Sequence, residues 1–72
     1  MRSLGLYIRK KRKEARLTYK QMAQRCGVTV QAVWYWEKDM KRPSYAKLWA
    51  IANALACDIY ELITYKIETE QK

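Results

Sequence analysis

The side chains with the clearest binding chemistry lie in a predicted helix over residues 30–38. Val33 and Trp36 fall on its apolar side at helical spacing. On the opposite side, Gln31 can pair bidentately with adenine, and Val30 can touch a thymine methyl group. The other residues of this outward side are Trp34, Tyr35 and Lys38. Each of the two aromatic residues could contact a base edge or a phosphate through one donor group and through van der Waals contact. Exposed aromatic residues are also typical of protein interfaces, so protein binding is the alternative to nucleic-acid contact for this pair.

Two cations stand just before a predicted helix start. Lys41 and Arg42 precede Ser44, which is the expected N-cap of the fourth helix. A helix N-terminus carries free N–H groups and partial positive charge. These residues are therefore suited to hold a phosphate.

Charge is distributed unevenly along the chain. The 72 residues carry a formal net charge of +8. Residues 1–42 hold 12 Lys and Arg against 3 Asp and Glu, whereas residues 43–72 hold 3 against 4. This asymmetry indicates a polyanion-binding face backed by a surface with another role. For the basic run at residues 9–13 alone, a merely solvated helix face is an equally good explanation.

Length and composition exclude several classes. A chain of 72 residues without His forms one domain with little room for an enclosed catalytic cavity. We expect no catalytic residue, metal ligand, cofactor or small-molecule substrate. Cys26 and Cys57 lie on apolar stripes, which favours small buried hydrophobes over redox sensors. No signal peptide is evident, and no apolar run approaches the roughly 20 residues of a membrane span, so we expect a cytoplasmic protein without membrane contact.

Helix start and stop signals predict an all-α domain. The expected helices cover about residues 3–15, 19–27, 30–38, 44–55 and 58–63. Leu4, Ile8 and Ala15 mark the buried side of the first helix.

Capping residues set the predicted boundaries of the other helices. Thr18 with Gln21, and Asp58 with Glu61, have the spacing of capping boxes. Gly27 supplies the left-handed residue that ends the second helix.

The C-terminal part has apolar residues without a place in this core. Tyr60, Tyr65 and Ile67 are surplus, so we expect self-association or partner binding through about residues 59–67. Residues 64–68 alternate polar and apolar, which fits a short strand, a helix extension or a frayed end. Trp49 and Tyr60 suit a core edge or a dimer contact equally well.

A helix, a glycine-containing turn and a second capped helix over residues 19–38 form the arrangement of a helix-turn-helix. The stretch LTYKQMAQRCGVTVQAVWYWE, followed by RPS and LWAIANAL, resembles the lambda-repressor-like Cro/XRE family of phage and bacterial regulators. The resemblance covers about residues 4–63. It implies a five-helix DNA-binding domain in residues 1–63, a recognition helix starting at Val30, and a C-terminal tail at 64–72 that is an interface or frayed.

This sequence departs from the family at three positions. The family usually has Gln in place of Tyr19, where it contacts the DNA backbone, and Tyr keeps only a single hydroxyl contact. Gly is usual at both Asp39 and Ala56. The turn after the third helix and the end of the fourth are therefore expected to differ in detail.

Two charged residues lie on core-facing positions of the first and third helices. Arg12 and Glu37 should be paired, because buried charges are costly alone. The resemblance implies the same bridge, since the family has Arg and Glu at these positions. No nucleophile, base or metal constellation accompanies Glu37, so we assign it no catalytic role.

We therefore expect a sequence-specific transcriptional regulator that binds double-stranded operator DNA, of the kind found in phage or mobile-element switches. The alternative is an antirepressor or modulator that keeps the fold and binds a partner repressor. The expected partners are DNA and either a second copy or another repressor; double-stranded RNA is disfavoured by its deep, narrow major groove. The expected DNA-contacting residues are Tyr19, Lys20, Thr29, Val30, Gln31, Trp34, Tyr35, Lys38, Lys41, Arg42 and Ser44.

Overall fold

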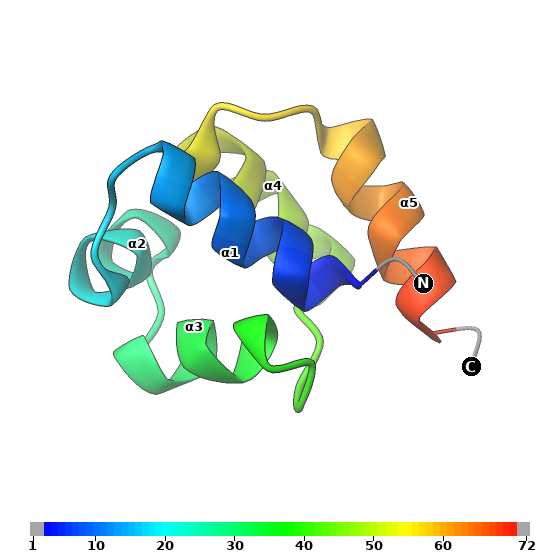
Figure 1. Cartoon of the computed structure of the whole chain (residues 1–72), viewed down its shortest axis with the longest axis horizontal. Coiled ribbons are helices and arrows are strands. Elements are labelled where there is room, and N and C mark those ends of the chain that lie inside the picture. The colour runs from blue at the N-terminus through cyan, green and yellow to red at the C-terminus, as the bar shows by residue number, and fades with distance from the viewer. Residues whose placement is uncertain (1–2, 71–72) are drawn as a thin grey trace.

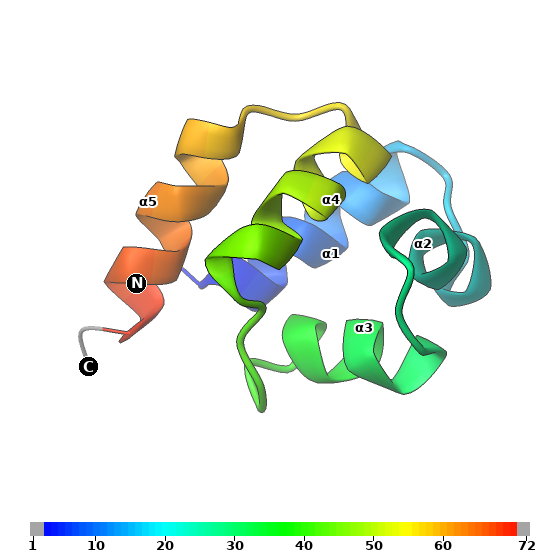
Figure 2. The same cartoon turned by 180° about the vertical axis from the view of Figure 1, so that it is seen from behind.

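The computed structural model describes residues 3–70, and these form five α-helices without a strand. The helices are α1 (Leu4–Glu14), α2 (Tyr19–Cys26), α3 (Val30–Glu37), α4 (Tyr45–Leu55) and α5 (Ile59–Glu70). Helices α1 and α4 lie at the centre, with α1 in front in Figure 1 and α4 in front in the reverse view of Figure 2. Helices α2 and α3 lie on one side of this pair, and α5 lies at the other end of the molecule. The predicted all-α, five-helix class is confirmed.

The predicted caps start the helices. At Ser3, Thr18, Thr29 and Ser44 the side-chain oxygen accepts from the backbone N–H three residues later. The capping box of Thr18 and Gln21 is complete, with bonds of 3.1 and 2.9 Å. Each cap satisfies N–H groups that would otherwise lack partners at a helix start.

The second predicted capping box forms only in part. The Asp58 carboxylate accepts from the Tyr60 N–H at 2.9 Å, as a cap should. Glu61 has a different partner, because its carboxylate accepts a hydrogen bond from the hydroxyl of Tyr7 on α1. A tertiary contact therefore replaces the local bond that the sequence predicts.

Core residues from all five helices meet at the centre. The apolar side chains that are less than 2% exposed are Leu4, Ile8, Met22, Val33, Leu48, Ile51 and Leu62. Ala15 was expected in this core but is exposed. Because α1 ends at Glu14 and Arg16 adopts a left-handed φ of 58°, the chain turns inward at Leu17, which is buried instead.

Helix α5 extends well beyond the predicted end at residue 63 and reaches Glu70. Of the three alternatives for residues 64–68, the structure has the helix extension. Its buried residues are Leu62, Lys66 and Thr69, which recur at helical spacing. Two of these three residues are polar. The apolar pattern in the sequence therefore ends at residue 63, although the buried face of the helix continues. Within residues 3–70, no helix combines the length and apolar character that crossing a bilayer requires.

Candidate nucleic-acid interface

Helices α2 and α3 meet across a tight turn that leaves one side of α3 facing outward (Figure 1). Gly27 ends α2 in the left-handed conformation, with φ 67°, which only Gly adopts without strain. Val33, Trp36 and Glu37 of α3 are buried against the body of the domain. The first and outer positions of α3 therefore remain available to a ligand.

The outward side of α3 carries the residues that the sequence predicted for it. Val30 is 46% exposed and Trp34 is 40% exposed. Gln31 and Lys38 are exposed, and Tyr35 is half-buried. One surface thus combines an amide, an apolar side chain, two aromatic rings and a cation.

Cations lie over the aromatic rings of this surface. The Trp34 and Tyr35 rings meet edge to face, with centroids 5.5 Å apart. The Lys38 ammonium lies 5.7 Å from the Trp34 ring centroid, and that of Lys41 lies 5.1 Å from the Tyr35 centroid. The electrostatic attraction between an ammonium group and the face of an aromatic ring holds both Lys side chains beside α3. A groove of about 200 Å³ runs between α3 and Lys41 and is lined by Thr29, Gln31 and Tyr35.

The residues of the expected phosphate site before α4 differ in their hydrogen bonds. Lys41, Arg42 and Ser44 are all exposed. The Arg42 guanidinium donates to the carbonyl oxygen of Thr69 at 3.2 Å. Part of its donor capacity is therefore used at the C-terminal end of α5. The Ser44 hydroxyl oxygen accepts from Lys47 N–H at 3.2 Å, which fixes the start of α4.

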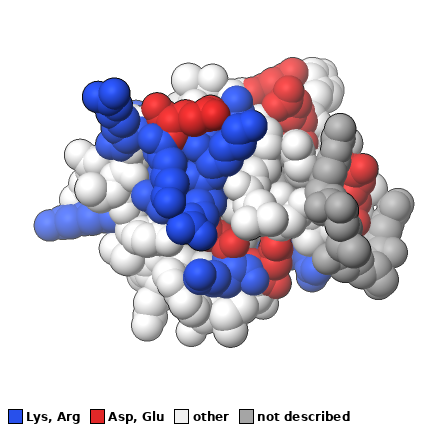
Figure 3. Space-filling view, in the orientation of Figure 1, with Lys and Arg blue, Asp and Glu red and all other residues white. Residues whose placement is uncertain are grey.

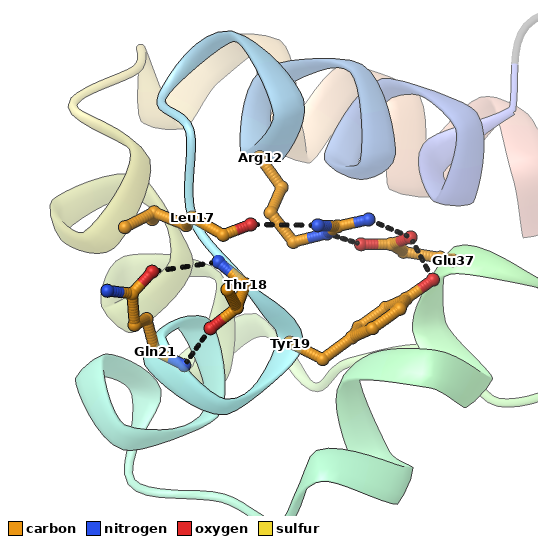
Figure 4. Close-up of polar contacts among 6 residues, drawn as sticks. All are labelled: Arg12, Leu17, Thr18, Tyr19, Gln21 and Glu37. Atoms are coloured by element: carbon orange, nitrogen blue, oxygen red, sulfur yellow. Dashed lines mark hydrogen bonds and ion pairs between the residues drawn. The ribbon is translucent and has the colours of Figure 1, made fainter.

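Tyr19, the expected contact to the DNA backbone, uses its side chain inside the domain in this structure. Its hydroxyl donates to Glu37 Oε1 at 3.0 Å, and its ring lies 4.1 Å from the centre of the Arg12 guanidinium. Figure 4 shows the side chain directed into the domain. An aromatic ring reaches the buried ion pair from the start of α2, so the hydroxyl is used there. Of the other helix-start candidates, Lys20 and Thr29 are exposed.

The predicted ion pair is present and joins α1 to α3 (Figure 4). Arg12 Nε donates to Glu37 Oε2 at 2.6 Å, and Nη2 donates to Oε1 at 3.4 Å. Nη1 donates to the carbonyl oxygen of Leu17 at 2.8 Å. The two side chains are only 9% and 1% exposed. The hydrogen bonds to Glu37 raise the pKa of Arg12, which keeps its charge fixed.

Positive charge gathers away from the core-facing side of α1. Figure 3 shows Lys and Arg side chains clustered over the part of the surface formed by α1 and α2. The exposed cations of α1 include Arg9, Lys10 and Lys13. Such a surface attracts a polyanion over several ångströms and raises its association rate.

The predicted interface residues separate into two groups. Tyr60 is 75% exposed and Ile67 is 41% exposed, so both stand on the surface of α5. Tyr65 was expected to lack a place in the core, but it is half-buried and stacks on Tyr7, with ring centroids 4.4 Å apart. It belongs to the contact between α1 and α5, because the extended α5 carries it onto that face. Trp49 is 60% exposed, which removes the core-edge interpretation for this residue.

The two cysteines are free thiols in the described chain. Cys26 is buried and Cys57 is half-buried. Burial raises the pKa of both thiols, so each stays protonated and poorly reactive at neutral pH. No three Asp, Glu, Cys or His side chains within residues 3–70 gather where they could hold a metal ion.

Known proteins share this fold. The sequence matches the family described as Helix-turn-helix over residues 8–62. The P22 c2 repressor in complex with a synthetic operator is 27% identical, with a TM-score of 0.82 covering 86% of this chain and 94% of that one. The solution structure of the P22 c2 DNA-binding domain gives 28% identity and a TM-score of 0.81, covering 85% and 80%. SinR in its complex with SinI gives 25% and 0.78, covering 92% and 65%. No curated protein matches the sequence significantly.

Proposed function

Because the chain belongs to the Cro/C1-type helix-turn-helix family, we propose that this DNA-binding transcriptional regulator reads a specific double-stranded site with α3. The observation that carries the proposal is the outward side of α3, where an amide and an apolar side chain stand exposed at the helix start. A helix presented in this way fits the major groove of B-DNA, whose base edges carry a distinct pattern for each pair.

Each residue of the α3 surface has a proposed role. Gln31 reads an adenine through two hydrogen bonds, and Val30 packs on a thymine methyl group. Trp34 and Tyr35 add van der Waals contact and single donors. Lys38, beside them, contacts a phosphate and fixes the register of the helix without reading sequence.

Additional phosphate contacts are proposed at the helix starts near α3. Lys41 lies over the Tyr35 ring and therefore on the same surface. The exposed candidates Lys20, Thr29, Arg42 and Ser44 complete this set. Arg42 must exchange its bond with Thr69 for a phosphate or extend a second donor to it. Similarity to the P22 c2 repressor, which was solved with a synthetic operator, supports a switch of the phage or mobile-element type.

The first experiment separates readout from positioning. A preferred site is selected from random duplexes, and affinity is measured on it and on its single-base variants. Gln31→Ala is expected to lose about 1–3 kcal/mol on the best site and to relax the preference at one base pair. Lys41→Ala is expected to weaken all sequences alike. Asn53→Ala, an exposed amide on α4, is the matched control and is expected to bind as the parent does.

The effect of Gln31→Ala on sequence preference tests the assignment of α3 as the recognition helix. If Gln31→Ala keeps the full sequence preference, α3 does not read DNA through the outward side described here. The salt dependence gives a second check. About 6 neutralised phosphates per dimer give a slope of log affinity against log salt near −5. A flat response, or no duplex binding at low salt, would overturn the DNA-binding proposal.

A second candidate function is the binding of a partner repressor. The exposed aromatic residues favour it, since Tyr60 and Trp49 are 75% and 60% exposed, and aromatics dominate interface energetics. SinR, which shares the fold, was solved in complex with another protein, SinI. We assign Tyr60 and Ile67 to a contact with a second copy or with such a partner. A chain that binds a repressor but no duplex DNA would favour the antirepressor role.

A further inference from the structure

The N-terminus of α1 is held by three different parts of the chain. Its first free N–H groups are those of Leu4, Gly5 and Leu6. Leu4 donates to Thr69 Oγ1 of α5 at 2.9 Å, and Leu6 donates to its own cap at 3.2 Å. Gly5 donates to Asp39 Oδ1 at 3.0 Å, in the turn between α3 and α4. One carboxylate from that turn therefore caps a distant helix.

Close packing accompanies this bond. A Cβ on Gly5 would stand 2.6 Å from the carbonyl oxygens of both Trp36 and Glu37, and 2.9 Å from Asp39 Oδ1. The positive N-terminal end of α1 thus lies against the negative C-terminal end of α3. The carboxylate of Asp39 adds a full negative charge at the same point, where it is most stabilising.

Asp39 is held firmly by both its side chain and its backbone. The second carboxylate oxygen accepts from the Ser3 hydroxyl. The backbone is left-handed, with φ 56°, a conformation that Asp tolerates better than most residues but that Gly adopts more freely. Its N–H donates to Trp36 O at 3.2 Å. The left-handed backbone and the side-chain bonds to Ser3 and Gly5 together define the position of this turn against α1.

The neighbours of Asp39 are the cations of the proposed DNA surface. Lys38 precedes it and lies over Trp34; Lys41 follows two residues later and lies over Tyr35. We propose that Asp39 is a positioning residue for DNA binding, which anchors the turn to α1 and so holds Lys38 and Lys41 in place to contact phosphates. The inference rests on the proposed function and adds how this chain aligns its cations there.

The sign of the effect separates positioning from simple electrostatics. Asp39 is negative and lies near the surface proposed for a polyanion, so removing its charge alone should tighten DNA binding. Loss of the hydrogen bonds that anchor the turn to α1 should instead weaken DNA binding. Two variants remove the same charge. Asp39→Asn keeps an oxygen that can accept from Gly5 N–H, while Asp39→Gly keeps the left-handed turn and loses the cap.

The test measures duplex affinity and its salt dependence for the parent and both variants, at a temperature where urea unfolding shows all three folded. Asp39→Asn is expected to bind as tightly as the parent or tighter. Asp39→Gly is expected to bind about three- to tenfold more weakly and to lose about one unit of salt slope for each phosphate contact that is no longer made. A merely structural role would leave the slope of folded protein unchanged.

A double-variant cycle checks that the effect passes through Lys41. In a Lys41→Ala background the additional loss caused by Asp39→Gly should shrink, because the cation that it positions is already absent. If Asp39→Gly binds as tightly as Asp39→Asn, the positioning role is wrong, while the proposed function stands on the parent's own binding. If the parent binds no duplex DNA at low salt, the proposed function fails, and this inference fails with it.

Discussion

Breaking the Arg12–Glu37 pair is expected to be the most damaging conservative change in this domain. Glu37→Gln leaves the guanidinium in a site where the pair of side chains is 9% and 1% exposed. Arg cannot lose its proton to escape the cost, because a guanidinium group stays protonated in proteins. Arg12→Met leaves the carboxylate with the Tyr19 hydroxyl at 3.0 Å as its remaining described partner.

The expected magnitude follows from the burial. Removing one partner of a buried pair costs about 3–5 kcal/mol, because the other charge stays uncompensated. A domain of 72 residues has a total stability of about 4–11 kcal/mol. Either single variant should therefore lose a large share of the stability of the domain, and at the lower end of this range it would be unfolded at 25 °C. The double variant Arg12→Met with Glu37→Met removes both charges and should recover to within about 2 kcal/mol of the parent.

Urea unfolding followed by circular dichroism and by the fluorescence of buried Trp36 measures these differences. The pair of Lys11 and Glu14, at 3.6 Å and with side chains 32% and 54% exposed, is the control, and Glu14→Gln should change the free energy of unfolding by less than about 0.5 kcal/mol. Unfolding free energies within about 1 kcal/mol of the parent for both single variants would refute the argument that burial makes this pair costly to break.

Three further changes have defined outcomes. Burial and the bond to Glu61 raise the pKa of Tyr7, so its stabilisation is present below about pH 10 and is lost as pH rises further; Tyr7→Phe should flatten this part of the stability profile, and an unchanged profile would count against it. Ala56→Gly should raise the free energy of unfolding by about 0.5–1 kcal/mol in thermal melts, because Ala56 has a φ of 52°; a lower melting temperature would contradict this. Tyr60→Glu with Ile67→Glu should lower the association state in sedimentation while the helical content stays constant, and unchanged association would place the interface elsewhere.

Local signals explain why the helix order was predictable. Each of the first four helices starts at a Ser or Thr whose oxygen accepts a backbone N–H, and such caps can be read from neighbouring residues alone. Gly27 ends α2 for an equally local reason. The outward side of α3 also follows from spacing, because Val33 and Trp36 define the buried side.

The extension of α5 was not predictable in this way. Its buried face continues through Lys66 and Thr69, whose polarity hides them from an apolar pattern. Each also makes a tertiary contact that only the folded chain supplies. The Lys66 ammonium pairs with Glu70 and lies 5.0 Å from the Tyr45 ring centroid, and the Thr69 hydroxyl accepts from Leu4 N–H at 2.9 Å.

The sequence by itself determined the helical class, the helix-turn-helix order, the Arg12–Glu37 pair and the side of α3 that faces outward, because these follow from contacts within a few residues or from the cost of burying charge. Only the tertiary structure decided where Tyr19, Asp39 and Arg42 direct their polar groups. Their partners lie on other helices, at sequence separations of 18, 34 and 27 residues. A side chain with several possible partners is assigned by three-dimensional proximity, and spacing along the chain does not encode that proximity.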